Sequence, residues 1–209
     1  MNNIFENVTL GKNVVIEPFC IIGQPPKGFS EGDLETVIGA DSLIRSHTVI
    51  YAGNKIGSRF QTGHQVTIRE NNIIGSDCAI GTYGELAFDI KIGNNVKFHS
   101  DCHIYEGTLV EDDVRFNPGV FVLNAKYPYR PGQKTRIEPV VIRRGAIIAA
   151  RCTLMPGVQI GRCAFIGAGS LVTKSVPDFA VVYGRPAAIR GDIRTLKDSS
   201  GTLLYEVKE

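Results

Sequence analysis

Glu106 and Asn124 are the two polar residues whose spacing most clearly suggests chemistry. Asn124 follows Glu106 by the length of three hexapeptides, and the same spacing continues backwards through Phe88 and Glu70. A carboxylate can orient an amine and take a proton from it, and a carboxamide beside it offers both a donor and an acceptor. These residues form one site only if the backbone returns to the same place after each such interval.

Two of the four histidines are further candidates for proton transfer. His64 occupies the same kind of position as Glu106 but in another column, and His103 precedes Glu106 by three residues, where we expect it to be exposed. A single surface histidine is more often structural or solvated than catalytic. We treat His64 and His103 as helpers of Glu106 and Asn124, with direct proton transfer to Glu106 or to the substrate itself as the alternative.

An apolar residue at every sixth position predicts the elements that hold these side chains. Between Ile38 and Val122, twelve of the fifteen positions on this period are Ile, Leu or Val, and the period returns from Ile142 to Val172. Neither a helix nor an alternating strand has a period of six. The pattern predicts a parallel β-helix in which three hexapeptides close a turn, so that residues one turn apart stack at a distance of about 4.8 Å.

Two other positions of the hexapeptide are also restricted. The fourth residue after the apolar one is often small, and we expect it to point into a narrow core. The residue directly after the apolar one is often glycine, which we expect to ease a sharp corner. Examples of the small position are Cys20, Ser42, Thr48, Cys78, Cys102, Thr108, Ala146, Cys152, Ala164 and Ser170. Examples of the glycine position are Gly11, Gly39, Gly57, Gly75, Gly93, Gly161 and Gly167.

The repeat breaks in two places, and both breaks are candidates for functional loops because loops on a rigid scaffold often carry sites. We expect a β-helix over residues 1–176, with loop insertions at 24–35 and 125–141, and a C-terminal extension over 177–209. The second loop contains Tyr127, Tyr129 and Arg130 with several prolines, which suits the binding of a base, a sugar or a diphosphate.

The composition excludes several classes of protein. The net charge of the 209 residues is only +2, and no basic run or basic–aromatic stripe suggests a nucleic-acid partner. No apolar stretch is long enough to cross a bilayer and the first residues do not resemble a signal peptide, so we expect no membrane partner and a cytoplasmic location. Four of the five cysteines fall on the small inward position, which favours buried thiols over disulfides or a zinc site.

The repeats resemble those of the hexapeptide acyltransferases. Three segments sharpen the resemblance to members that use acetyl-CoA: residues 145–158, residues 166–177 and Gly184-Arg185-Pro186-Ala187. The resemblance implies an all-β, left-handed parallel β-helix with a short C-terminal tail, assembled as a homotrimer. It also implies acetyl-CoA or another acyl-CoA as the acyl donor, and no metal.

One branch of that family is more similar than the others, the N-acyltransferases of nucleotide-linked dideoxy amino sugars. The segments that carry this likeness are 62–70, 105–108, 111–114 and 121–125, followed by the proline-containing loop. The likeness implies a dTDP- or UDP-linked amino sugar as the acceptor, contacted by Glu106 and Asn124. Phe88 stands where that branch keeps a histidine, which favours direct proton transfer to Glu106 or to the substrate over a fixed histidine base. Phe88 is assigned to substrate binding together with Tyr127, Tyr129 and Arg130.

The resemblance also suggests where the donor binds. Small residues in the last coils let a pantetheine arm run beside the backbone, and cations beyond them can meet phosphates. The candidates are Ala149, Ala150, Gly167, Ala168, Lys174 and Arg185.

Two other functions remain open on the sequence. One is a γ-type carbonic anhydrase, which would need histidines converging on zinc; His103 lies off the corner, which argues against that geometry. The other is a sugar O-acetyltransferase. A non-catalytic β-helix scaffold is disfavoured by the donor-binding segments and by the loop.

Overall fold

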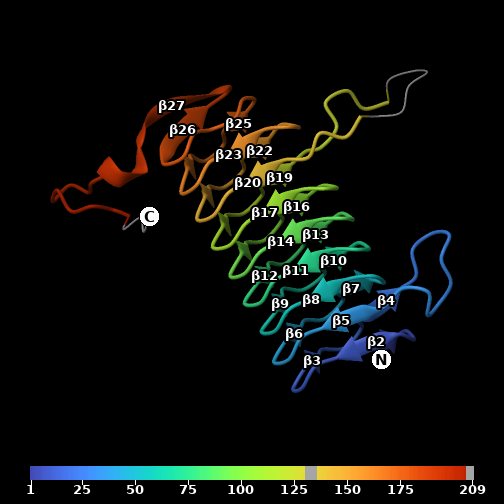
Figure 1. Cartoon of the computed structure of the whole chain (residues 1–209). Coiled ribbons are helices and arrows are strands. Elements are labelled where there is room, and N and C mark those ends of the chain that lie inside the picture. Colours follow the sequence, from blue (N-terminus) through green and yellow to red (C-terminus); the bar gives the residue numbers. More distant parts are fainter. Residues whose placement is uncertain (130–135, 206–209) are drawn as a thin grey trace.

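The computed structural model describes residues 1–129 and 136–205 and forms one continuous parallel β-helix (Figure 1). Each turn contributes one short strand to each of three sheets, here called A, B and C. Within each sheet, strands of successive turns pair in parallel, and the usual register pairs a residue with the one three hexapeptides later, as between Glu85 and His103. The predicted all-β fold and its six-residue period are therefore confirmed.

The strands of sheets A and B are short because each corner ends them after two to four residues. Sheet A contains β1 (Asn3–Ile4), β4 (Ile21–Gln24), β7 (Val49–Tyr51), β10 (Thr67–Ile68), β13 (Glu85–Leu86), β16 (His103–Ile104), β19 (Phe121–Val122), β22 (Thr153–Leu154) and β25 (Leu171–Val172). Sheet B contains β2 (Val8–Leu10), β5 (Thr36–Ile38), β8 (Lys55–Ile56), β11 (Ile73–Ile74), β14 (Lys91–Ile92), β17 (Leu109–Val110), β20 (Val141–Ile142) and β23 (Gln159–Ile160).

Sheet C is extended at the C-terminal end by a hairpin. It contains β3 (Val15–Ile16), β6 (Leu43–Ile44), β9 (Gln61–Thr62), β12 (Ala79–Ile80), β15 (Lys97–Phe98), β18 (Arg115–Phe116), β21 (Ile147–Ile148), β24 (Phe165–Ile166), β26 (Ala180–Gly184) and β27 (Ala187–Asp192). β26 continues the parallel order beside β24, β27 returns antiparallel to it, and a 3₁₀ turn, η1 (Ile193–Thr195), follows. Within the described ranges, no helix is long and apolar enough to cross a membrane.

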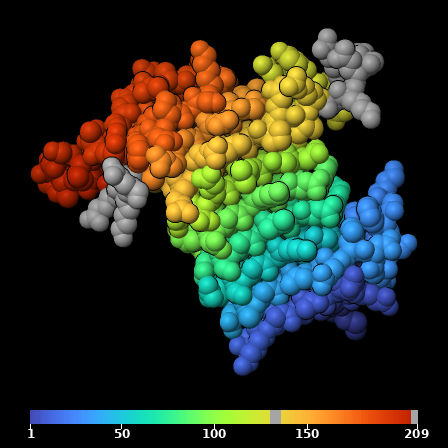
Figure 2. All heavy atoms as spheres, in the orientation of Figure 1, coloured from blue at the N-terminus to red at the C-terminus, as the bar shows by residue number. Residues whose placement is uncertain are grey.

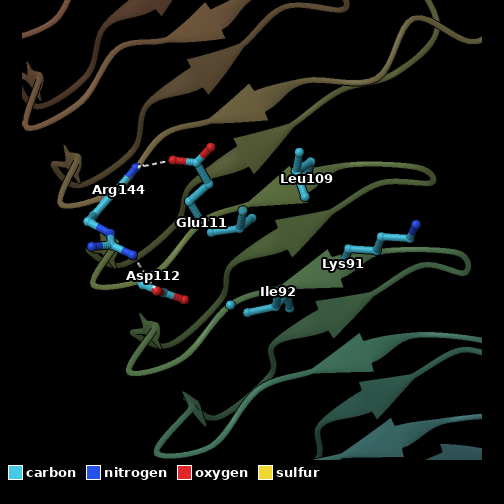
Figure 3. Close-up of a pocket in the computed structure, with 8 residues that line it drawn as sticks. Lys91, Ile92, Leu109, Glu111, Asp112 and Arg144 are labelled. Carbon is cyan, nitrogen blue, oxygen red and sulfur yellow. Dashed lines mark hydrogen bonds and ion pairs between the residues drawn. The ribbon is translucent and has the colours of Figure 1, made fainter.

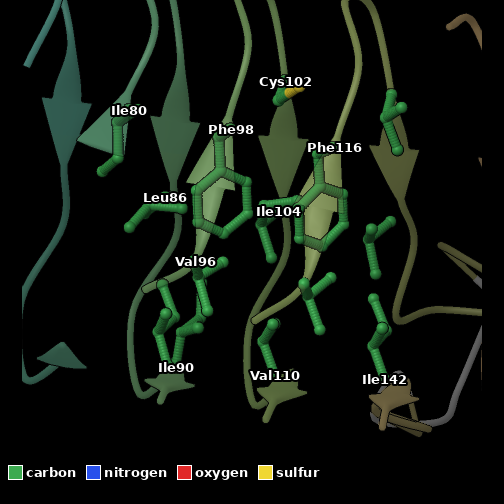
Figure 4. Close-up of a cluster of buried hydrophobic side chains, with 14 of the residues drawn as sticks. Ile80, Leu86, Ile90, Val96, Phe98, Cys102, Ile104, Val110, Phe116 and Ile142 are labelled. Atoms are coloured by element: carbon green, nitrogen blue, oxygen red, sulfur yellow. The ribbon is translucent and has the colours of Figure 1, made fainter. Parts of the chain in front are cut away.

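The core is a single column of inward side chains that runs the length of the β-helix. The six-residue period supplies most of it, and Phe98 stacks on Phe116 of the next turn with ring centroids 4.4 Å apart (Figure 4). The small inward position predicted from the sequence is buried, but it also accepts bulky residues such as Phe60 and Ile90. Burial of this apolar surface is the main stabilising contribution, at about 25 cal/mol per Å².

The glycines that follow the apolar position have a different role from the one predicted. The residue that turns the corner in the left-handed conformation is two positions further on, for example Asp77 at φ 61°. A Cβ added to Gly39 would lie only 2.5 Å from the backbone of Gly57 in the next turn. Glycine is therefore required because successive turns stack closely there, not because the backbone bends at that residue.

Both loop insertions leave the β-helix from the same edge. The first lies between β4 and β5 and the second between β19 and β20, and Figure 1 shows both projecting from one side of the solenoid. We call this the A–B edge because each turn passes there from sheet A to sheet B; the B–C and C–A edges are defined in the same way. In the space-filling view, the first loop (blue) and the described part of the second (yellow) protrude on that side (Figure 2).

Candidate functional site on the A–B edge

Glu106 and Asn124 lie on successive turns at the A–B edge, one above the other. The sheet A register pairs Ile104 with Val122, so the residues two positions later are also neighbours. The Asn124 side chain donates a long hydrogen bond from Nδ2 to the Glu106 backbone carbonyl, at 3.4 Å. Phe88 lies directly below Glu106 in the same column.

Glu106 is a half-buried carboxylate with no hydrogen-bonding or ionic partner for its side chain among the residues that the structure describes. Its pKa is raised above the ordinary value, first by desolvation and second by the negative charge of Asp89 on the turn below. A carboxylate that is unpaired and more basic than usual is suited to accept a proton from a bound substrate.

The second loop begins at Asn124 and returns to the same corner. Ala125 forms an antiparallel bridge with Ile137, and Glu138 N–H donates to the Asn124 carbonyl at 2.7 Å. A Cβ added to Gly107 would lie 2.9 Å from Pro139, so the returning backbone packs against the turn that carries Glu106. The base of the loop is thus fixed beside the candidate site.

The aromatic residues assigned to this loop extend into solvent. Tyr127 is 65% exposed and Tyr129 is 95% exposed, and Lys126 lies over the Tyr127 ring at 5.7 Å. Such exposed rings are available to stack on a ligand. Arg130 lies outside the described residues.

Arg69 and Glu70, below Phe88, form a second polar group on this edge that the sequence reasoning missed as a pair. The guanidinium contacts the carboxylate through two hydrogen bonds of 2.8 and 2.9 Å and lies 5.7 Å from the Phe88 ring centroid. The Glu70 carboxylate is thereby paired, and the Arg69 guanidinium covers one face of the Phe88 ring. The spacing of one turn predicts that Glu70 lies below Phe88, but it gives no signal for the pairing of Glu70 with its neighbour Arg69.

His103 lies on the face of sheet A and not at the edge. Its Nδ1 is 3.1 Å from Glu85 Oε2 and its Nε2 is 3.0 Å from Asp101 Oδ1, and its ring stacks on Phe121 with centroids 4.7 Å apart. The side chain is 22% exposed, less than the sequence suggested. Because both ring nitrogens are engaged, the structure offers no free nitrogen of His103 to the Glu106 carboxylate.

His64 is separated from Glu106 along the solenoid. It follows β9 at the C–A edge, whereas Glu106 follows β16, and two turns separate β10 from β16 in sheet A. Its Nδ1 shares a hydrogen bond of 2.9 Å with the Ser46 hydroxyl. Within one chain, therefore, His64 and Glu106 are not brought together.

The candidate donor-binding residues divide between two edges of the β-helix. Because β21 and β24 pair with an offset of one turn, the four small residues stack as two pairs at the C–A edge: Ala149 below Gly167, and Ala150 below Ala168. A Cβ added to Gly167 would lie 2.7 Å from Tyr183, so the terminal hairpin packs directly on this column. Arg185 is exposed in the turn between β26 and β27.

Lys174 belongs instead to the A–B edge. β22 and β25 pair Leu154 with Val172, which places Lys174 above Pro156 in the column of Asn124. It is exposed. One chain therefore has an exposed cation, Lys174, above Glu106 and Asn124 on the A–B edge, and a glycine- and alanine-rich column on the C–A edge.

A hollow lies over sheet B and the B–C edge, on residues of β14 and β17 and of the turns that follow strands of sheet B (Figure 3). It is lined by Lys91, Ile92, Gly93, Leu109, Val110, Glu111, Asp112 and Arg144. Glu111 accepts hydrogen bonds from Arg143 at 2.7 Å and from the Arg144 backbone at 2.9 Å, and Arg144 also pairs with Asp112 at 2.8 Å. These contacts lower the pKa of the Glu111 carboxyl, although desolvation, the largest single influence, opposes them. Most charges of the hollow are thus satisfied internally, and its position does not connect it with the loop.

A metal centre was one alternative for the histidines. In residues 1–129 and 136–205, no group of three or more His, Cys, Asp or Glu side chains is arranged to hold a metal ion. His64 and His99 are on the C–A edge and His103 is on the face of sheet A.

Comparisons with known proteins agree on the repeat and on the fold. The sequence pattern described as bacterial transferase hexapeptide (six repeats) matches residues 139–174. LpxA, a UDP-N-acetylglucosamine acyltransferase from Bacteroides fragilis, has a similar fold, with a TM-score of 0.59 at 18% identity over 91% of this chain and 72% of that one. Repeat and fold together confirm the hexapeptide-repeat, left-handed β-helix predicted from the sequence, and the matched repeat is one described for bacterial transferases.

Two curated relatives act on different kinds of acceptor. A galactoside O-acetyltransferase of Lactococcus lactis is 34% identical over 119 residues, which is 51% of this chain and 56% of the relative. A dTDP-3-amino-3,6-dideoxy-α-D-galactopyranose 3-N-acetyltransferase of Aneurinibacillus thermoaerophilus is 45% identical over 51 residues, which is 24% of this chain and 27% of the relative. The chain thus spans about half or less of the length of these relatives.

Proposed function

We propose that this protein transfers an acetyl or other short acyl group from acyl-CoA to the amine of a dTDP- or UDP-linked dideoxy amino sugar. The observation that carries the proposal is Glu106: it is unpaired among the described residues, its pKa is raised, and it is stacked with Asn124 at the base of the large loop. The similarity to an amino-sugar N-acetyltransferase supports the same acceptor class.

The proposed reaction needs one base near the acceptor nitrogen. Glu106 takes a proton from the ammonium, and the neutral amine attacks the thioester carbonyl, forming the C–N bond. Collapse of the tetrahedral intermediate breaks the C–S bond, and the second nitrogen proton goes to the departing thiolate. The products are the amide and the CoA thiol, and Glu106 returns its proton to solvent.

Transfer to a sugar hydroxyl is the second candidate function, since a galactoside O-acetyltransferase is also similar to this chain. A hydroxyl holds its proton far more tightly than an ammonium does, so O-acyl transfer benefits from a free imidazole base beside the acceptor. In the column of Glu106 the residue below is Phe88, and His103 has both nitrogens engaged. This arrangement favours an amine acceptor.

A homotrimer would explain why the two halves of the proposed site lie on different edges. Ala149, Ala150, Gly167 and Ala168 are on the C–A edge, whereas Glu106 and Asn124 are on the A–B edge. Cyclic assembly allows the C–A edge of one chain to meet the A–B edge of the next, so that donor and acceptor bind in one cleft. The predicted cytoplasmic location fits substrates that are cytoplasmic metabolites.

The experiment that tests the proposal is a thiol-release assay with a panel of acyl-CoAs and acceptors. The panel should contain dTDP- and UDP-linked amino sugars, the same sugars with hydroxyl in place of the amine, and a simple galactoside. The proposal predicts turnover with at least one nucleotide-linked amino sugar and much slower release with its hydroxyl counterpart. Comparable or faster turnover of the hydroxyl compounds would favour the O-acyltransferase.

A further inference from the structure

Glu138 occupies the same corner position as Glu106, one turn higher. The register of sheet B pairs Val110 with Ile142, a wider separation than three hexapeptides, because the large loop is inserted between them. Glu138 precedes Ile142 by four residues, as Glu106 precedes Val110. Asn124 is attached to the strand of sheet A and Glu138 precedes the strand of sheet B, so the insertion leaves two residues, both polar, at a corner where each neighbouring turn has one residue.

The backbone fixes Glu138 in this place. Its N–H donates to the Asn124 carbonyl at 2.7 Å, and its carbonyl accepts from the Gly157 N–H of the next turn at 2.8 Å. A Cβ added to Gly157 would lie 3.1 Å from Oε2 of Glu138. The carboxylate therefore rests over a glycine, on the far side of Asn124 from Glu106.

The side chain of Glu138 contributes little to the stability of the fold. It is 33% exposed, and its one ionic contact in the described part of the chain is to Arg136, which is 88% exposed and 4.0 Å away. An exposed ion pair of that length contributes almost nothing to stability. A carboxylate that is held by its backbone, beside the candidate site, and without a strong partner is free to bind a ligand.

We infer that Glu138 is a specificity-determining residue. Its carboxylate accepts a hydrogen bond from a hydroxyl of the acceptor sugar, on the ring carbon next to the one that carries the amine. This inference rests on the proposed function. Because Asn124 Nδ2 points towards the Glu106 carbonyl, Asn124 Oδ1 is turned away from that carbonyl. This oxygen can accept a hydrogen bond from the bound sugar. An amine placed at Glu106 then directs the neighbouring ring substituent towards Glu138. A carboxylate only accepts hydrogen bonds, so it selects a hydroxyl over a hydrogen or an ether at that ring carbon.

The test compares acceptors that differ by one hydroxyl. The probes are dTDP-3-amino-3,6-dideoxygalactose, whose amine is flanked by two hydroxyls, and its 2-deoxy and 4-deoxy analogues. We expect the wild-type protein to prefer the parent sugar over one of the analogues by about 10- to 100-fold in kcat/KM, the range of a hydrogen bond to a charged group. Glu138→Ala should reduce that preference to within about threefold, and Glu138→Gln, which keeps a neutral acceptor, should give an intermediate value.

Controls separate binding from structure. Glu35→Ala removes an exposed carboxylate from the other loop of the same edge and should leave the preference unchanged. The thermal midpoint of Glu138→Ala should match the wild type, since the weak Arg136 contact is its only described ionic partner. The inference is overturned if the wild type does not discriminate between the sugars, or if Glu138→Ala keeps the preference while the protein still acylates the amine. If none of these three sugars is acylated, the same comparison is made with the amino sugar of the panel that is acylated and its deoxy analogues. Failure of the wild type to acylate any nucleotide-linked amino sugar of the panel would instead overturn the proposed function and this inference with it.

Discussion

Replacement of Glu106 by glutamine should remove proton transfer while leaving the structure intact. Gln has the same shape, and the Glu106 carboxylate has no side-chain partner among the described residues that the change could leave unpaired. A positioned general base contributes about 10²- to 10⁴-fold to turnover, so kcat should fall by that factor. The Kd of the acyl-CoA should stay within about twofold, because Glu106 contacts the acceptor amine in the proposed cleft, whereas the donor is held by the C–A edge of the neighbouring chain and by Lys174.

The pH dependence gives a second readout of the same variant. Folding raises the pKa of Glu106, through desolvation and then through Asp89, so wild-type kcat/KM should fall as the pH drops through that raised value. The glutamine variant should lose this acid limb and keep only the titration of the substrate amine, which both proteins share.

Glu106→Gln should lose activity but should not lose stability. A carboxyl with a raised folded pKa contributes stability below its unfolded pKa, and this contribution is lost as the pH rises through the folded value. Glutamine cannot ionise, so the variant should melt at the wild-type temperature or slightly above it near neutral pH. Wild-type turnover in Glu106→Gln, or lost turnover with a lowered melting temperature, would refute the assignment of Glu106 as the base.

Three further predictions concern the loop, the stacking of turns and the assembly. Replacing residues 126–136 by a short Gly/Ser link should leave the far-UV circular dichroism unchanged and raise the KM of the nucleotide sugar severalfold or more; an unchanged KM would mean that the loop does not bind it. Gly39→Ala should destabilise the protein by about 1–3 kcal/mol in urea unfolding, because its Cβ would lie 2.5 Å from the next turn, whereas Gly191→Ala, with no atom within 4 Å, should have almost no effect. Light scattering should give the mass of three chains, and the mass of one chain would contradict the shared cleft.

Much of the fold follows from one periodicity. The six-residue spacing of apolar residues determines which side chains point inward, and with a turn of three hexapeptides it predicts that Glu106 and Asn124 are stacked. The role of the glycines was not predictable in the same way, because close approach between turns is a tertiary contact with residues of the next turn. The six-residue period shows which positions are glycine, but it does not show that the backbone of the next turn lies against them.

The loop limited what could be predicted about the site. Glu138 is far from Glu106 in sequence, and its position depends on how the backbone returns after the insertion. Its distance of four residues from Ile142, equal to that of Glu106 from Val110, was the available signal. For His103, the partner Glu85 was predictable from its offset of one turn, but the contact with Asp101 depends on the rotamer of the ring.

The most direct test of the proposed function is the chemical identity of the acylated product. The wild-type protein would be incubated with acetyl-CoA and a dTDP-linked 3-amino-3,6-dideoxyhexose, and the product examined by mass spectrometry before and after mild alkaline treatment, with NMR to locate the acetyl group. The account predicts one acetyl group on nitrogen, as an amide that survives mild alkali. An alkali-labile acetyl ester on a ring hydroxyl, with the amine still free, would contradict it.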